Sequence, residues 1–566
     1  MMTGFRQQTP RRERVARVAP GFQNRRRNRR QDALAGLTGA VRAVPDGMAA
    51  AALAGVNPLH GVYAAIVGPV AGGLGSSTRL MIVSTTGAAA LAAGSVVAPL
   101  APAQRPAALV LLTLVAGVAA LVVGLARLGR YLRFVSQSVV LGFLGGVAVS
   151  IVAGQLPGLL GAPAEGAVPL VRGFDVLLAP ARIDGATAVV GLGALVIMVA
   201  VARTRFAVVG ALVALAVPSA VVLLAGLDGV ATIGDAGPLP LLPDLGLFSP
   251  DLVAGGIAVA VIVLVRGAAI GETTPNPDGS RVHADRDFLA QGAANVAAGL
   301  VGGLPVGGSA GGTALNRAAG ARTRWAAVWS GVGVLAILVL FSGVIGHVAL
   351  PALAAVLVVA AARSSRPGEL ATVLRTGGLS RLAAVTVFLA ALLLPVAAAV
   401  FVGVALSLLL QLNRDGVDLR VVEVVPRADG RCTEVPVPAT LTSHEITVLD
   451  VYGSLLFAGA GNLRARLPDP AGTVGAVLVL RLRGRTSLGA TFLALAADYA
   501  RALGAAGGRL YLSGVDRGVA ESFRRAGTVS LTGPVRMFGA TDVLWESAAA
   551  PYREADTWVV RHRGGG

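Results

Sequence analysis

Two stretches rich in glycine and hydroxyl side chains interrupt long hydrophobic segments of the chain. They lack the bulk of lipid-facing helices, and irregular backbone at membrane depth persists only where protein buries it or where it lines a cavity. A hydrophobic segment interrupted in this way is the sequence signature of a transporter's binding site. The predicted substrate-binding residues are those at the two breaks, Ser84, Thr85, Thr86 and Gly87 in the first and Gly308, Ser309, Ala310 and Gly311 in the second.

The two breaks predict a pair of short helices whose N-termini face each other near the middle of the bilayer. Free backbone N–H groups and the positive ends of both helix dipoles would meet there, which suits an anion. Hydroxyls and amides can replace water around an oxyanion without a full counter-charge, which permits release as well as binding. The alternative interpretation is close packing of small residues between membrane helices.

Two acidic residues in hydrophobic surroundings are further candidates. Glu272 ends the eighth hydrophobic segment, and a carboxylate within a membrane is costly enough to suggest a function. It could bind Na⁺ or relay a proton as the coupling ion, or it could lie at the cytoplasmic end and pair with an arginine such as Arg266. Asp46 lies between Pro45 and Gly47, a pattern that predicts a helix break. Asp46 would then cap the second half of that helix or lie in the substrate cavity.

Other kinds of chemistry find no support in the sequence. The five histidines lack metal-ligand spacing, and there is neither a nucleophile, base and orienter set nor a Gly-Lys-Ser/Thr phosphate loop. We therefore expect no enzyme, no catalytic residue, no metal and no cofactor, and transport that is secondary rather than driven by ATP. The net charge of +18 comes entirely from arginine, without an aromatic-interleaved basic patch, so no nucleic-acid partner is expected.

The elements that position these residues follow from composition. The chain has 566 residues, 55% hydrophobic and 14% charged, with a mean hydropathy of +0.73, which indicates a polytopic membrane protein. Residues 1–32 form an arginine-rich arm, expected to be disordered and cytoplasmic. Residues 33–412 contain about fourteen apolar segments, counting half-helices. Arginine follows each even-numbered segment from the fourth to the twelfth, whereas the loop at 227–251 has none, so both termini are predicted to be cytoplasmic in a cell membrane.

The composition changes after residue 412, where charge rises and β-branched runs begin to alternate with helical periodicity. This alternation predicts a small α/β domain at 413–550, followed by a C-terminal tail at 551–566. The expected strands are Glu445–Val451, Val474–Leu482 and Arg509–Leu512, and the expected helices are Leu488–Leu503, Gly518–Ala526 and Ala540–Ala549. The single cysteine, Cys432, excludes an intrachain disulfide framework.

These motifs resemble those of one family. Ala43–Ala49 and Leu53–Tyr63 resemble the first-to-second-helix signature of SulP anion transporters, and residues 291–323 resemble the family's ninth and tenth segments. The C-terminal domain is similar to a STAS domain. The resemblance implies an α-helical membrane domain of two inverted repeats of seven segments, a core domain that moves against a gate domain, and a homodimer. It also associates an acid near the position of Glu272 with coupling.

The sequence departs from the family pattern at two places. Many members carry a basic residue where this chain has Gly312, so no arginine side chain is expected to neutralise the anion there. Helix dipoles or a bound cation would then contribute more to neutralising the anion. The phosphorylatable STAS loop is degenerate here, so no switch is expected at Ser487.

The sequence thus predicts a secondary active transporter of a small inorganic anion, such as sulfate or bicarbonate, that works by alternating access. Two alternatives stay open: a membrane anion sensor that acts on a cytoplasmic partner protein through the STAS domain without flux, and a nucleobase carrier of the same fold. The identity of the anion, the coupling ion (Na⁺ or H⁺) and the direction of transport are left open.

Overall fold

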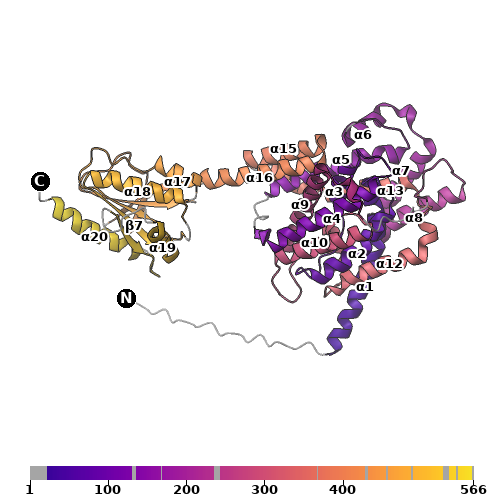
Figure 1. Ribbon diagram of the computed structural model, residues 1–566, viewed down its shortest axis with the longest axis horizontal. Helices are drawn as coiled ribbons and strands as arrows, with labels where there is room; N and C mark the ends of the chain where they lie inside the picture. The colour runs from indigo at the N-terminus through magenta and orange to yellow at the C-terminus, as the bar shows by residue number, and fades with distance from the viewer. Residues whose placement is uncertain are drawn as a thin grey trace. The chain divides into compact units, whose positions relative to one another are not determined.

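The computed structural model describes residues 22–130, 136–166, 168–204, 206–234, 243–365, 367–375, 377–417, 419–427, 431–453, 455, 457–485, 488–526, 535–543 and 546–563. The chain divides into a helical unit that ends at Ser407 and an α/β unit that begins at Leu408 (Figure 1). The division falls within helix α16 (Val396–Val417), slightly before the predicted boundary at residue 412.

The predicted α-helical membrane domain is confirmed, because each expected apolar segment contains a helix. These helices are α1 (Phe22–Leu53), α2 (Leu59–Gly75), α3 (Gly87–Val97), α4 (Arg105–Leu125), α5 (Gln137–Leu160), α7 (Gly185–Ala202), α8 (Gly210–Leu224), α9 (Pro250–Thr273), α10 (Ala284–Leu300), α11 (Ala310–Ala318), α12 (Trp325–Ile345), α13 (Leu350–Ser364), α15 (Gly378–Leu393) and α16. The segment count omitted two short helices, α6 (Pro169–Leu178) and α14 (Pro367–Arg375). By length and composition alone, five of the described helices could cross a membrane, namely α4, α5, α7, α9 and α12.

The N-terminal arm is shorter than predicted. Helix α1 begins at Phe22, so residues 22–32 of the arm are helical, and residues 1–21 lie outside the described part. Arginine and glutamine are good helix formers and extend a helix that the apolar segment nucleates. Asp32 is 1% exposed and accepts hydrogen bonds from the backbone N–H groups of Arg322 and Thr323, which ties the third turn of α1 to the loop before α12.

Helix contacts repeat between the two halves of the unit. The contact of α4 with α10 corresponds to that of α12 with α2. The contact of α9 with α4 corresponds to that of α1 with α12. The contact of α3 with α9 corresponds to that of α11 with α1. Exchanging α1–α4 with α9–α12 in order maps the two members of each of these three pairs of contacts onto each other, as two structural repeats require. Helices α5 to α8 and α13 to α15 form a second group around α5 and α13. These two groups correspond to the expected core and gate.

The α/β unit contains a six-stranded sheet of order β4-β3-β5-β6-β7-β8, parallel from β5 to β8. The strands are β3 (Arg420–Pro426), β4 (Cys432–Val435), β5 (Ile446–Tyr452), β6 (Val477–Arg481), β7 (Arg509–Val515) and β8 (Val535–Gly539). Helices α17 (Phe457–Arg464), α18 (Ala490–Ala505) and α19 (Arg517–Ala526) complete the core on one face. The sequence predicted β5, β6, β7, α18 and α19, and missed β3, β4, β8 and α17.

The predicted C-terminal tail is wrong. Helix α20 (Glu546–Arg563) covers the second face of the sheet, where Ala555 and Val559 are buried with Val477 and Val479 of β6. The predicted helix at 540–549 is also misplaced, because the chain becomes helical only at Glu546 among the described residues. A parallel sheet has two apolar faces, and α20 removes the second from water.

Candidate functional site

A short two-stranded sheet brings the two predicted breaks together. Strand β1 (Val83–Thr85) pairs antiparallel with β2 (Val306–Gly308), with Ser84 opposite Gly307. Helix α3 follows β1, and helix α11 follows β2. Because the strands are antiparallel, the two helices leave in opposite directions and both direct their N-terminal ends toward the strand pair. Ser84, Thr85 and Gly308 therefore lie in the sheet, while the remaining predicted residues begin the two helices.

The two helix starts differ in capping. At the N-cap of α11, the Ser309 hydroxyl accepts a hydrogen bond from the Gly312 N–H at 3.1 Å, and the Ser309 N–H donates to the Ile82 carbonyl at 2.8 Å. At the N-cap of α3, the Thr86 side chain makes no capping bond. The first N–H groups of a helix have no acceptor within it, so α3 in particular can offer donors to a ligand. Within the described residues, the buried Thr85 hydroxyl also has no partner.

Solvent reaches the first turns of both helices but not the strands. Residues 83–85 and 306–308 are buried. Gly87 is half-buried, as are Ser309, Ala310 and Gly312, and Gly311 is exposed. An ion could therefore approach the helix starts while the strands behind them stay packed.

A stripe of buried polar residues on α10 holds β2 in place. The Asn295 amide accepts from the Val306 N–H at 2.9 Å and donates to the Val306 carbonyl at 2.7 Å. One turn earlier, Gln291 Oε1 accepts from the Gly308 N–H at 3.1 Å. Our site prediction omitted both side chains. The sequence pattern that could have identified them is a polar residue at every fourth position of an apolar helix, which places these residues on one face. Polar side chains inside a membrane domain are energetically costly and therefore indicate a function.

The third member of this stripe, Asp287, holds the loop that precedes β1. Its carboxylate is 1% exposed and accepts from the Ser76 hydroxyl at 2.7 Å and from the Thr78 N–H at 3.0 Å. The start of α2 makes the corresponding contact in the other half, where His60 Nδ1 lies 2.5 Å from the Gly302 carbonyl. The loop before each β-strand is therefore held by the first turn of a helix from the opposite repeat, α10 for β1 and α2 for β2.

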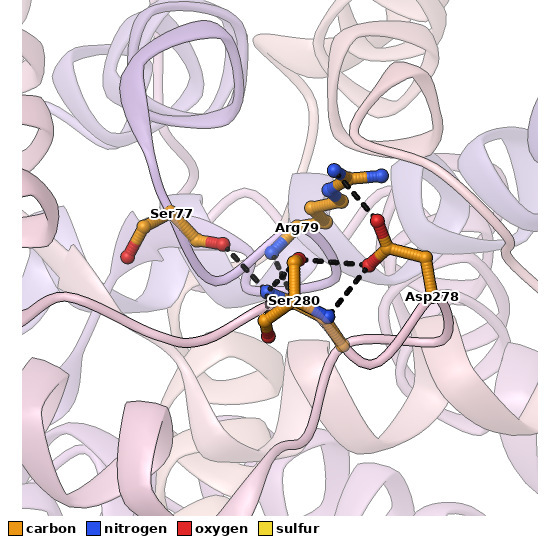
Figure 2. A network of polar contacts seen from close by, with 5 residues as sticks. Ser77, Arg79, Asp278 and Ser280 are labelled. Carbon is orange, nitrogen blue, oxygen red and sulfur yellow. Dashed lines mark hydrogen bonds and ion pairs between the residues drawn. The ribbon is translucent and has the colours of Figure 1, made fainter. Parts of the chain in front are cut away.

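The loop after α9 reinforces this anchor, as Figure 2 shows for Ser77, Arg79, Asp278 and Ser280. Asn276 accepts from the Arg79 N–H at 2.8 Å and donates to the Ser77 carbonyl at 2.9 Å. The Arg79 guanidinium pairs with Asp278 at 2.8 Å. Slight burial would raise the pKa of Asp278, but hydrogen bonds from Ser280 and the charge of Arg79 outweigh it and lower that pKa.

Glu272 is the predicted coupling residue. It is exposed on the last turn of α9, immediately before the loop of Figure 2. Arg266 is half-buried on the same helix. The coupling role of Glu272 stays a prediction. Ser487 lies outside the described residues.

The predicted helix break at Asp46 does not form. Helix α1 is continuous through Pro45, and the Asp46 carboxylate pairs with Arg42 at 2.9 Å instead of capping a second half-helix. Proline is tolerated inside a membrane helix when neighbouring helices hold it. The close crossing at Gly47 and Gly61 does so here, since a Cβ at either glycine would collide with the carbonyl of the other.

A basic side chain reaches the first turn of α11 from another helix. A Cβ added to Gly311 would lie 2.7 Å from Arg42 Nη2 and 3.2 Å from its Cζ, so the guanidinium rests against the first turn of α11. An arginine side chain therefore does reach this turn, from α1 rather than from position 312. Within the described part of the chain, no three His, Cys, Asp or Glu side chains lie close enough to share a metal ion.

Comparison with known proteins decides the family. Residues 30–390 match the sulfate permease family, which is more than half of the chain. This chain belongs to the sulfate permease family. It is therefore a multi-pass membrane transporter and not an enzyme, as predicted, and its C-terminal unit is consistent with the expected STAS domain.

Relatives and solved structures agree with this assignment. A probable sulfate transporter of Mycobacterium tuberculosis (strain CDC 1551) is 29% identical over 70% of this chain and 73% of its own length. A putative sulfate transporter of Bacillus subtilis is 31% identical over 61% and 66%. The murine Slc26a9 anion transporter in the inward-facing state shares the fold with a TM-score of 0.77 at 17% identity, over 93% of this chain and 91% of its own. The transmembrane domain of the cyanobacterial bicarbonate transporter BicA shares the fold with a TM-score of 0.59 at 21% identity. This match covers 67% of this chain and 98% of the BicA domain.

Proposed function

We propose that this member of the sulfate permease family is a secondary active transporter that carries a small inorganic oxyanion across the cell membrane. The observation that carries the proposal is the antiparallel pairing of β1 with β2, which directs the N-termini of α3 and α11 toward one place. Two helix dipoles and their free N–H groups favour an anion there. Sulfate and bicarbonate are the candidates, in line with the names of the relatives in Mycobacterium, Bacillus and cyanobacteria.

In this mechanism the helix starts bind the anion through backbone N–H groups and the Ser309 hydroxyl. The group containing α3 and α11 then moves against the group around α5 and α13, which opens the site to the other side of the membrane. A ligand held by dipoles and hydroxyls is released more readily than one held by a fixed full charge alone. Glu272 is the proposed coupling residue, for Na⁺ or H⁺. We further expect a homodimer with both termini in the cytoplasm and a STAS domain that binds a regulatory protein.

The proposal is tested by uptake into proteoliposomes. Labelled sulfate and bicarbonate are compared under imposed Na⁺ or proton gradients. Ser309→Trp should abolish uptake without loss of folding because it fills the accessible first turn of α11. Ala200→Trp, on an exposed position of α7, should leave uptake unchanged. Glu272→Gln should abolish gradient-driven accumulation.

Failure of well-folded wild-type protein to take up any anion would overturn the proposal and favour the sensor that acts without flux. Unchanged uptake by Ser309→Trp would instead refute the site while leaving the transport activity in place.

A further inference from the structure

Arg42 and Asp46 form an ion pair at the accessible end of the site. The two atoms Arg42 Nη2 and Asp46 Oδ2 lie 2.9 Å apart, one turn along α1, and their side chains are 31% and 27% exposed. The same Nη2 is the nearest atom to a Cβ added at Gly311. One guanidinium therefore touches both a carboxylate on α1 and the first turn of α11.

This arrangement sets a positive charge beside the positive end of a helix dipole. The combination is unfavourable unless an anion lies with it, particularly in membrane surroundings where an arginine must be compensated. In the structure, Asp46 supplies that anion. Arg363, in the last turn of α13, is also near enough to attract the Asp46 carboxylate.

We propose that Arg42 is a direct ligand of the transported anion, and that Asp46 holds its guanidinium until the substrate displaces it. This inference rests on the proposed function and extends it to a side chain that binds the substrate. A guanidinium presents parallel N–H groups that match two oxygens of one ligand. The site therefore selects an oxyanion such as sulfate over a halide. The Asp46 carboxylate stays beside Arg42 after it is displaced, so it competes with the bound substrate and keeps binding reversible.

Two single substitutions should have opposite effects on affinity. Arg42→Gln removes the charged ligand and should raise the KM for sulfate on the order of tenfold or more, as expected for a hydrogen bond to a charged group. Asp46→Asn keeps the size of the side chain but removes the internal competitor, and should lower that KM several-fold. Arg42→Lys keeps the charge without the paired donors and should reduce the preference for sulfate over chloride.

The measurements are labelled sulfate uptake in proteoliposomes and competition by chloride, with thermal unfolding in detergent as the test of folding. Arg172→Gln is the matched control, because Arg172 is exposed on α6 and its loss should not change KM. The double variant Arg42→Gln with Asp46→Asn removes both members of the ion pair, so it tests the ligand role even if Arg42→Gln alone does not fold. Its KM should match that of Arg42→Gln.

The outcomes distinguish a failure of the proposed transport function from a failure of the proposed role of Arg42. If wild-type protein moves no anion, the proposed function fails. If wild type transports sulfate but the double variant keeps its KM, or if Asp46→Asn weakens sulfate binding as Arg42→Gln does, the ion pair only braces α1. This inference is then overturned while the transport function stands.

Discussion

Replacing Asn295 with leucine tests whether α10 fixes the position of β2. The Asn295 side chain is 1% exposed, and its amide satisfies both the N–H and the carbonyl of Val306, a residue that is fully buried. Leucine has the same branched arrangement of side-chain heavy atoms but no polar atom. Asn295→Leu therefore leaves two backbone groups of β2 unpaired in a site that water does not reach.

The expected loss follows from the cost of each orphaned group. An unsatisfied buried donor or acceptor costs about 1–3 kcal/mol, so two cost roughly 2–6 kcal/mol of unfolding free energy. Domains are typically stable by about 5–15 kcal/mol, so the variant should fold with reduced stability. Because β2 leads directly into α11, its release should also displace the first turn of that helix and reduce anion uptake.

Denaturant unfolding in mixed micelles measures the stability, and hydrogen exchange of the peptide containing residues 304–309 measures the local effect. Ala293→Leu provides the matched control, since Ala293 is exposed on the same helix and a leucine there should be neutral. Stability of Asn295→Leu within about 0.5 kcal/mol of wild type, together with normal uptake, would refute the argument that this amide positions β2.

Two further predictions concern the α/β unit. Val559→Asp should destabilise this unit by several kcal/mol because it buries an unpaired charge between α20 and the sheet. Val560→Asp is the control and should be tolerated, because Val560 is 64% exposed. Hydrogen exchange of β6 compares the two variants, and equal exchange would contradict the packing of α20 on the sheet. Burial, and then the charge of Glu445, raise the pKa of Glu423, so wild type should lose stability as pH rises from about 4.5 through that raised pKa. Compared with wild type, Glu423→Gln should therefore slow hydrogen exchange of β3 at pH 7, and this difference should disappear toward pH 4. An equal difference between variant and wild type at both pH values would show that the ionised Glu423 does not destabilise the fold.

The sequence by itself determined the class of the protein and the two glycine-rich places where short helices begin within its membrane domain. Hydrophobicity is a property of each residue and its neighbours along the chain, so apolar runs predict helices wherever they pack. The buried parallel strands β5, β6 and β7 are also apolar runs, and they were found for the same reason. Helix α20 was missed over most of its length because polar residues dominate it, and its buried apolar positions Ala548, Pro551, Ala555 and Val559 include a proline and two small alanines.

Tertiary structure decided what the local patterns could not. Proline and glycine around Asp46 predict a break, but the crossing at Gly47 and Gly61 keeps α1 helical. The hydrogen bonds of Asn295 to Val306 depend on how the chain folds back between a helix and the following strand. Arg42 reaches the first turn of α11 only because α1 and α11 pack together. Which side chains meet depends on the angles and offsets at which helices cross, and these are set by packing across the whole unit rather than by any single segment.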